Sequence, residues 1–206
     1  MHIDRYPKLL WYMHWNRCKF KILGAKLGNN VKLANKVYLH MGKDTNISIG
    51  NNVVIHSGDN LNPISSNTYC SIFVTDHAIL EIGDWSGISG GCIWSSERVS
   101  IGRHVNIGAN CIIIDGDIHN LDWAKRRIDR TPKNSVPFKH GQIIIEDDVW
   151  LGANCIILKN VTIGARSIIG AGSVVSKSIP ADCIAAGNPC KIIRMLKENS
   201  PQTLKT

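Results

Sequence analysis

Residues 145–175 read IEDDVWLGANCIILKNVTIGARSIIGAGSVV, and an apolar residue returns at every sixth position of this stretch. A period of six fits neither an α-helix, at 3.6 residues per turn, nor a simple strand, at two. It fits a coil with three short flat sides, in which the apolar residue points inward and a small residue permits the corner. The repeating positions are Ile145, Leu151, Ile157, Ile163, Ile169 and Val175, with glycine directly after three of them at Gly152, Gly164 and Gly170.

The same rhythm extends over most of the 206 residues, with a slip of one residue between Ile88 and Ile101. We therefore expect one repeat domain over residues 23–182. Residues 1–22 form an N-terminal cap, either a short amphipathic helix or an irregular segment. Residues 183–206 contain a turn at 187–189, a short helix and a tail. Earlier members of the rhythm are Leu27, Leu33, Leu39, Ile49, Ile55, Ile82, Ile88, Ile101, Ile107 and Ile113.

The rhythm stops at residues 115–142, DGDIHNLDWAKRRIDRTPKNSVPFKHGQ, a polar stretch with two prolines and no period. A long aperiodic segment inside a regular solenoid is more often functional than structural. We expect this extended loop to carry the chemistry.

The net charge of +8 is concentrated in basic residues near both ends of the chain. There is no recognisable nucleic-acid reader motif, so we expect no nucleic-acid partner. A small phosphorylated ligand or an anionic membrane surface accounts for the charge equally well. The N-terminal residues Leu9, Leu10, Trp11 and Trp15 either cover the end of the solenoid or make peripheral contact with a membrane.

Seven cysteines are scattered through the chain without a CxxC pair. This pattern favours reduced, structural thiols. No run of 18 apolar residues is present to span a bilayer, and the first residues lack a small-residue cleavage site. We therefore expect a cytoplasmic protein.

With its repeat, the loop sequence DGDIHNLD and the ending AAGNPCKIIR, the chain resembles the hexapeptide-repeat acyltransferases. It is most similar to their sugar O-acetyltransferases, which include galactoside and maltose acetyltransferases and enzymes of polysaccharide gene clusters. The resemblance implies an all-β fold, the left-handed parallel β-helix, shaped as a triangular prism. It also implies a homotrimer with active sites between neighbouring prisms, and acetyl-CoA as cosubstrate.

Acyl transfer to a hydroxyl requires a base that titrates near neutrality, and histidine suits this task. The resemblance places His119 at the catalytic histidine, in the pattern His, any residue, Leu, Asp. We expect Asp117 or Asp122, with Asp115 as a further possibility, to orient the imidazole or bind a sugar hydroxyl. Ordinary solvation explains each of these carboxylates as well.

The resemblance also implies binding residues for acceptor and donor. Ser89 falls near an acceptor-binding polar position, although a plain corner serine fits equally. The residues expected to line coenzyme A are Trp150, Ala153, Ala171, Ser176, Lys177, Lys191 and Arg194, with the two last-named facing its phosphates.

The same fold also serves zinc-dependent carbonic anhydrases, which need three converging histidines. No two histidines of this chain have that spacing, so we expect no metal site. We interpret the remaining candidates as surface or corner residues, namely His56, His77, His104 and His140.

The sequence thus predicts an acetyl-CoA-dependent O-acetyltransferase that modifies a glycan or glycan precursor, with His119 as general base. One alternative is N-acetylation of an amino sugar or xenobiotic, which would yield an amide rather than an ester. Another is a non-catalytic solenoid scaffold, which would not bind coenzyme A.

Overall fold

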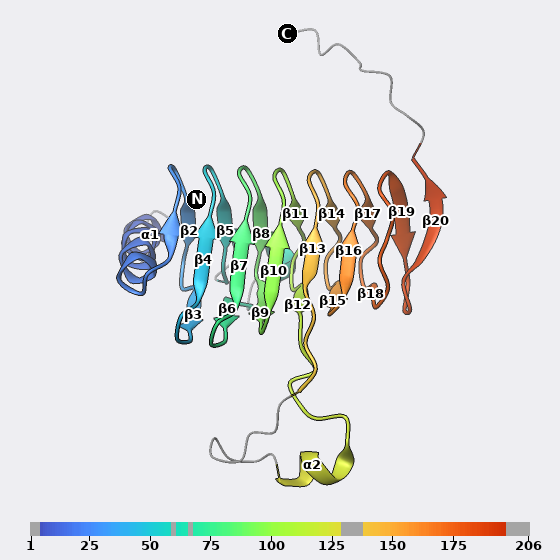
Figure 1. Ribbon diagram of the computed structural model, residues 1–206. Coiled ribbons are helices and arrows are strands. Elements are labelled where there is room, and N and C mark those ends of the chain that lie inside the picture. The colour runs from blue at the N-terminus through green and yellow to red at the C-terminus, as the bar shows by residue number, and fades with distance from the viewer. Residues whose placement is uncertain (1–4, 59–60, 66–67, 129–137, 197–206) are drawn as a thin grey trace, which may run out of the picture.

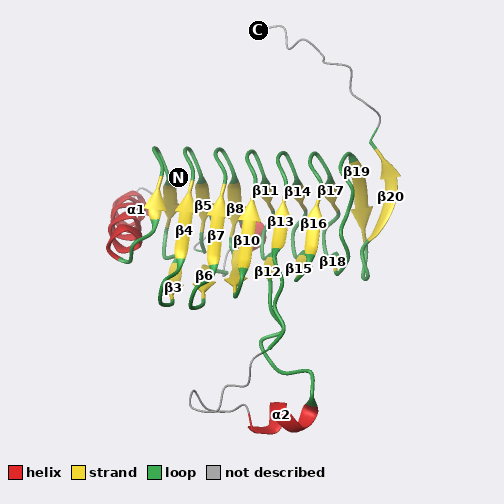
Figure 2. Ribbon diagram, in the orientation of Figure 1, coloured by secondary structure: helices red, strands yellow, loops and turns green. Residues whose placement is uncertain are grey.

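The computed structural model describes residues 5–58, 61–65, 68–128 and 138–196, and its strands stack into a three-sided prism (Figure 1). Each turn of the chain contributes one short strand to each side, so three sheets run the length of the prism (Figure 2). The strands of neighbouring coils pair in parallel, for example Ile101 with Ile145 and Ile145 with Ile163. The expected left-handed parallel β-helix is confirmed.

We call the three sides sheets A, B and C. Sheet A contains β1 (Lys26–Leu27), β4 (Asn46–Ile49), β7 (Ile79–Ile82), β10 (Arg98–Ile101), β13 (Ile143–Ile145) and β16 (Val161–Ile163). Sheet B contains β2 (Lys32–Ala34), β5 (Val54–His56), β8 (Gly87–Ser89), β11 (Asn106–Ile107), β14 (Trp150–Leu151), β17 (Ile168–Ile169), β19 (Cys183–Ala186) and β20 (Lys191–Met195). Sheet C contains β3 (Tyr38–Met41), β6 (Cys70–Val74), β9 (Gly91–Ser95), β12 (Ile112–Ile114), β15 (Ile156–Leu158) and β18 (Val174–Val175).

The core is a continuous stack of the residues that recur every six positions. Because side chains alternate across a strand, each strand turns its Ile, Leu or Val inward and its neighbours outward. Ile145, Leu151, Ile157 and Ile163 are all buried, and each packs above its counterpart in the preceding coil.

Most corners contain one residue in the left-handed region, commonly Asn or Asp, because their short polar side chains tolerate this conformation. Glycine has a different role there. A Cβ on Gly152 would lie 2.5 Å from the backbone nitrogen of Ala171, so the close stacking of coils requires glycine. We name the corners by the sheets they join: A/B, B/C and C/A.

The one-residue slip in the rhythm combines a shortened B/C corner with a lengthened C/A corner. After Ile88 the next inward residue is Ile93, one position early, and Gly90 and Gly91 adopt φ values of 68° and 99°. A Cβ on Gly91 would clash with the carbonyl oxygen of Cys111. Two glycines thus absorb the missing residue. The C/A corner then adds two residues, because Ile101 follows Ile93 after eight positions rather than six, and pairing with the next coil is kept.

Helix α1 (Arg5–Ile22) closes the N-terminal end of the prism (Figure 1). Phe20 is fully buried, and side chains of α1 donate hydrogen bonds to carbonyls of the first coil, which has no preceding coil to pair with. The Asn16 amide donates to the carbonyls of Leu33 and Asn35 at 2.9 and 2.6 Å. Arg17 donates to Val31, and Lys19 to Val37. Helix α1 thus packs on the first coil and provides donors for its carbonyl groups, which is the arrangement that an end cap requires.

The prediction of a short helix within residues 183–206 is wrong for residues 183–196, the part that the structure describes. Residues 191–195 form β20, antiparallel to β19, and β19 itself continues sheet B beyond residue 182. The physical reason is the open edge of sheet B, whose backbone groups need partners that a helix would not supply. The tail from residue 197 lies outside the described residues.

Helix α2 (Trp123–Ile128) lies in the extended loop, away from the prism (Figure 2). A short 3₁₀ turn, Pro63–Ser65, lies between β5 and β6. Within the ranges given above, neither α1 nor α2 has the length and apolar character needed to cross a membrane.

The cap predicts a specific loss of stability. Asn16→Leu keeps the size of the side chain but removes both donors, so two carbonyls near a buried side chain lose their partners. We expect the free energy of unfolding, measured in urea, to fall by about 2–4 kcal/mol. Lys21→Ala, on the exposed side of the same helix, should change it by less than about 0.5 kcal/mol. Equal effects of the two substitutions would contradict the capping role.

Candidate functional site

The extended loop leaves the prism at the C/A edge, and Asp115 anchors its base. This carboxylate is fully buried and accepts backbone N–H groups of Ser96, Glu97 and Arg98 at 2.5, 2.9 and 2.9 Å. It therefore provides the hydrogen-bond acceptors for the backbone N–H groups at the C/A corner of the preceding coil. The expectation that Asp115 faces His119 or a sugar is corrected by this geometry, since both of its oxygens accept hydrogen bonds inside the prism.

Two short segments form a neck between the prism and the outer part of the loop. The amide of Asp117 donates to the carbonyl of Lys139 at 2.9 Å, and the amide of Gly141 donates to that of Asp115 at 2.8 Å. His140 contributes a contact of 2.8 Å between its Nδ1 and the Glu97 carboxylate. His140 is thus a partly exposed anchor of the neck rather than a ligand or base.

An ion pair between Asp117 and Lys159 holds the neck from the side of the next coil. Both side chains are largely buried, and the second oxygen of Asp117 has no hydrogen-bond partner among the described residues. Lys159 engages one oxygen of Asp117, and no hydrogen bond joins the other oxygen to the His119 imidazole within one copy of the described chain.

His119 lies just beyond the neck and is exposed. The residue before it, Ile118, has a φ of 61°, which is strained for a β-branched side chain. Strained backbone of this kind persists only where the surrounding structure fixes it, and it clusters at active sites and ligand-binding sites. Among the described residues the His119 imidazole makes no hydrogen bond or ion pair that would orient it.

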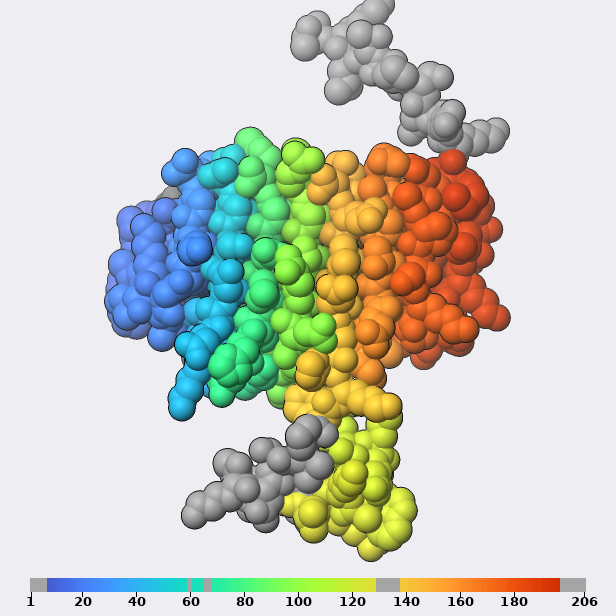
Figure 3. All heavy atoms as spheres, in the orientation of Figure 1, coloured from blue at the N-terminus to red at the C-terminus, as the bar shows by residue number. Residues whose placement is uncertain are grey.

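Asp122 begins helix α2 rather than contacting His119. Its Oδ1 accepts the amide of Ala124 at 2.9 Å, and its carbonyl accepts the amide of Arg126 at 2.9 Å. This is the geometry of a helix N-cap. Figure 3 shows the loop and α2 as a separate lobe beneath the prism.

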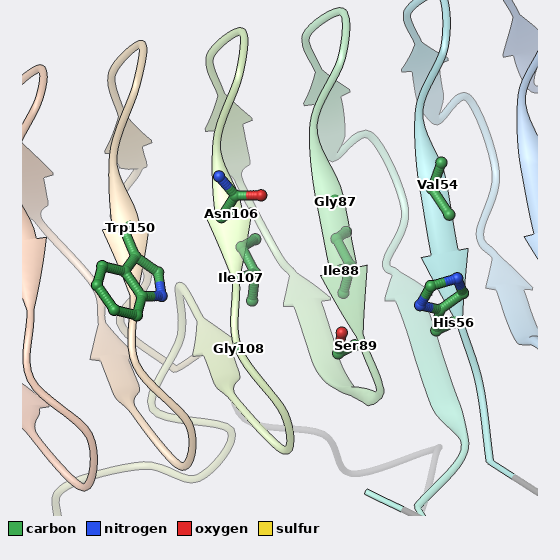
Figure 4. A pocket seen from close by; sticks show the side chains of 9 residues that line it. All are labelled: Val54, His56, Gly87, Ile88, Ser89, Asn106, Ile107, Gly108 and Trp150. Carbon is green, nitrogen blue, oxygen red and sulfur yellow. The ribbon is translucent and has the colours of Figure 1, made fainter. Parts of the chain in front are cut away.

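Ser89 and Trp150 line one shallow groove of about 280 Å³ on the outer side of sheet B (Figure 4). His56 and Asn106 complete its polar lining, and burial lowers the pKa of His56. Sequence reasoning treated His56 as a plain surface residue and did not consider Asn106. Register gives the missing signal, because His56 pairs with Ser89, and Asn106 with Trp150, in neighbouring coils.

The residues expected to bind coenzyme A are divided among separate parts of the prism. Ala153 and Ala171 lie at the B/C edge, whereas Ser176 and Lys177 lie at the C/A edge, together with the loop. One side of the prism separates the two edges, a width of roughly 10–17 Å for strands of three to five residues. Lys191 and Arg194 are exposed on β20, at the C-terminal end of sheet B.

The outer side of sheet C is unusually apolar. One row of paired outward residues comprises His40, Phe73, Trp94, Ile114 and Leu158, and a second comprises Tyr38, Ser71, Cys92, Ile112, Ile156 and Val174. The corresponding row on sheet A is Ser48, Glu81, Ser100, Ile144 and Thr162, which is mostly polar. Tyr38, His40 and Ile112 are exposed and the other residues of these rows are half-buried. A contiguous apolar surface of this extent marks an interaction surface.

The cysteines have structural positions. All seven are free thiols, and burial raises the pKa of Cys70 to about 12. At the B/C edge the thiol of Cys111 donates to the carbonyl of Gly152 at 3.1 Å, and that of Cys155 to the carbonyl of Gly170 at 3.3 Å. The described part of the chain contains no cluster of three metal-ligating side chains.

Two family models match the regular coils. The bacterial transferase hexapeptide model, of six repeats, matches residues 142–177, and the hexapeptide repeat of succinyl-transferase matches residues 98–116. A putative acetyltransferase of Staphylococcus aureus is 39% identical over 116 residues, which cover 50% of this chain and 58% of the relative. A galactoside O-acetyltransferase of Lactococcus lactis subsp. lactis is 37% identical over 107 residues, covering 51% and 47%. The chain thus spans about half the length of these curated relatives.

A solved structure extends the similarity over more of the chain. The hexapeptide-repeat-containing acetyltransferase of Vibrio cholerae O1 biovar eltor, in complex with acetyl-CoA, is 31% identical with a TM-score of 0.54. The match covers 71% of this chain and 72% of that one.

Proposed function

We propose, on the premise that this chain belongs to the hexapeptide-repeat acyltransferase family, that it transfers an acetyl group from acetyl-CoA to a sugar hydroxyl of a glycan or glycan precursor. The acetyl-CoA bound to the Vibrio relative and the galactoside O-acetyltransferase activity named for the Lactococcus relative support this donor and this class of acceptor. The observation that carries the proposal is the anchored neck, which holds exposed His119 beside the prism.

His119 acts as the general base in this reaction. Its neutral imidazole accepts the proton of the acceptor hydroxyl as that oxygen attacks the thioester carbonyl. A backbone N–H stabilises the resulting oxyanion, and its collapse forms the ester and breaks the carbon–sulfur bond. The imidazolium then returns the proton to the departing thiolate of coenzyme A. The strained backbone at Ile118 supports this role because it fixes the direction in which His119 leaves the neck.

We infer that the active site is shared between copies in a homotrimer. Three prisms around a threefold axis, each with sheet C facing inward, would bury the apolar rows of that sheet. In this arrangement the B/C edge of one copy lies beside the C/A edge of the next. The loop of one copy, with His119, then lies beside the B/C edge of the next copy, with Ala153 and Ala171. Within a single copy these two edges are separated by sheet C.

The donor would lie along this junction. Ala153 and Ala171 supply small corners at which the pantetheine arm reaches backbone groups, and Ser176 and Lys177 face it from the neighbouring copy. Trp150 flanks the arm from sheet B, while Lys191 and Arg194 bind the phosphates of coenzyme A. Their exposure on β20 supports this assignment, since a bulky polyanion needs access.

The acceptor would enter through the groove on sheet B, where Ser89 offers a hydroxyl beside His56. We assign Asp117 and Asp122 to holding the loop, because one oxygen of each is engaged by Lys159 and by the amide of Ala124. This assignment replaces direct acceptor binding by these two carboxylates.

His119→Ala tests the mechanism. Loss of a general base should reduce kcat by about 10²–10⁴, with acetyl-CoA consumption measured against a panel of sugars and lipid-linked oligosaccharides. Coenzyme A binding, followed by calorimetry, should be unchanged.

His77→Ala is the matched control, because His77 is also an exposed histidine near the C/A edge and should leave turnover unchanged. Wild-type turnover by the His119 variant would contradict the mechanism. A product that resists mild base would be an amide and would favour N-acetylation.

Ile112→Lys tests the inward position of sheet C. The side chain is already partly exposed, so the variant should fold, but three buried charges should break the trimer into monomers in light scattering. Ile144→Lys makes the same change on the outer side of sheet A and should leave the trimer intact. If the trimer survives Ile112→Lys but is broken by Ile144→Lys, the interface lies on sheet A rather than sheet C, and the inference is contradicted.

A further inference from the structure

The excess positive charge of the protein is held at its N-terminal end, since the rest of the chain has a net charge of −1. Residues 5–43 contain nine basic residues and no Asp or Glu, while the rest of the chain contains 15 basic and 16 acidic residues. The nine are Arg5, Lys8, Arg17, Lys19, Lys21, Lys26, Lys32, Lys36 and Lys43. This segment forms α1 and the first coil, so the charge gathers around one end of the prism.

The outer side of α1 combines this charge with large exposed apolar side chains. Leu10, Trp11, Trp15 and Ile22 are 49%, 58%, 52% and 81% exposed, and Leu23, directly after the helix, is 46% exposed. The two tryptophan rings stack in parallel with centroids 5.9 Å apart, and Lys8 and Lys21 are exposed on the same helix. The combination of Trp and Leu with surrounding Lys is typical of helices that lie in a membrane interface.

The inner side of α1 is committed to the first coil. Phe20 and Asn16 are buried against the first coil, where Asn16 and Arg17 hold its carbonyls. Within the described residues, α1 is the last element at this end of the prism, shown in blue in Figure 3. Trp11 and Trp15 lie at the margin of the helix, where they border the first coil but keep more than half of their surface exposed.

A cavity of about 380 Å³ opens between α1 and the first coil. It is lined by Trp11 and Trp15 on one side and by Lys36 and Tyr38 on the other, with the Lys36 ammonium 4.5 Å from the centre of the Tyr38 ring. Burial and the nearby charge of Lys36 lower the pKa of Lys19, which also lines the cavity. Lys19 and Lys36 are neighbouring cations, and residues 5–43 contain no carboxylate side chain to pair with them. The cavity therefore favours binding of an anionic group such as a phosphate.

We propose that the outer side of α1, together with the lysines around it, docks the protein on an anionic membrane surface. Leu10, Trp11, Trp15 and Ile22 enter the interface, and the lysines contact lipid phosphates. The prism then stands with this end on the bilayer, which would bring it to acceptors carried on lipid. Binding itself requires neither catalysis nor coenzyme A, so this proposal and the proposed activity fail separately.

Vesicle flotation of the full-length protein tests this surface. We expect binding to vesicles of phosphatidylcholine with about 30% phosphatidylglycerol, and at least about tenfold weaker binding to phosphatidylcholine alone. The double variant Trp11→Ala/Trp15→Ala should bind anionic vesicles about tenfold more weakly or worse. Lys8→Glu/Lys21→Glu should lose a similar factor and most of the salt dependence.

The matched control is Trp85→Ala/Trp123→Ala, which removes two equally exposed tryptophans elsewhere on the molecule and should bind like the unmodified protein. Thermal melting of each variant verifies its fold. The proposal is overturned if the unmodified protein does not float with anionic vesicles, or if both tryptophan pairs have the same effect. It is also overturned if an acidic oligosaccharide binds through Trp11 and Trp15 while vesicles do not.

Discussion

The whole structure depends on register between successive coils. Each backbone bond joins a residue to its counterpart in the next coil, and each inward Ile, Leu or Val packs on the same counterpart. A shift of one residue would turn the apolar set of a strand outward. Insertions and deletions are therefore tolerated only at corners, where the chain can return to the register of its neighbouring coil before the next strand begins.

Two departures from the repeat obey this constraint. The deletion at the B/C corner is absorbed by Gly90 and Gly91. The insertion of residues 115–142 leaves and re-enters at the C/A edge, where the amide of Gly141 donates to the carbonyl of Asp115. Sheet pairing then continues as though nothing had been inserted, since Ile101 pairs with Ile145 across the loop. The regular coils thereby hold the base of the loop, and the loop holds His119 outside them.

Sequence alone was sufficient for the solenoid, because a period of six has no other common structural explanation. It also located the loop that interrupts the period. It was insufficient where a partner is distant in the chain: Asp115 is buried on the turn at Ser96–Arg98, and Asp117 is paired with Lys159. The C-terminal segment was misjudged because its local sequence permits a helix, whereas the open edge of sheet B selects a strand.

The division of the candidate site follows from the same geometry. A motif match assigns residues to one ligand without regard to which corner they occupy, and Ala171 and Lys177 are only six positions apart in sequence. In the prism those six positions cross sheet C from one edge to the other. The apolar outer side of sheet C lies between the edges and offers the surface through which a second copy could reunite them.

Mixing two inactive variants tests this shared site most directly. His119→Ala lacks the base on the C/A edge, and Ala171→Trp blocks the donor on the B/C edge. Each alone should be inactive, but every mixed ring of three contains one junction with both halves intact, so random mixing should restore about one quarter of normal turnover. Mixed trimers, identified by two affinity tags, that remain inactive would contradict a site shared between copies.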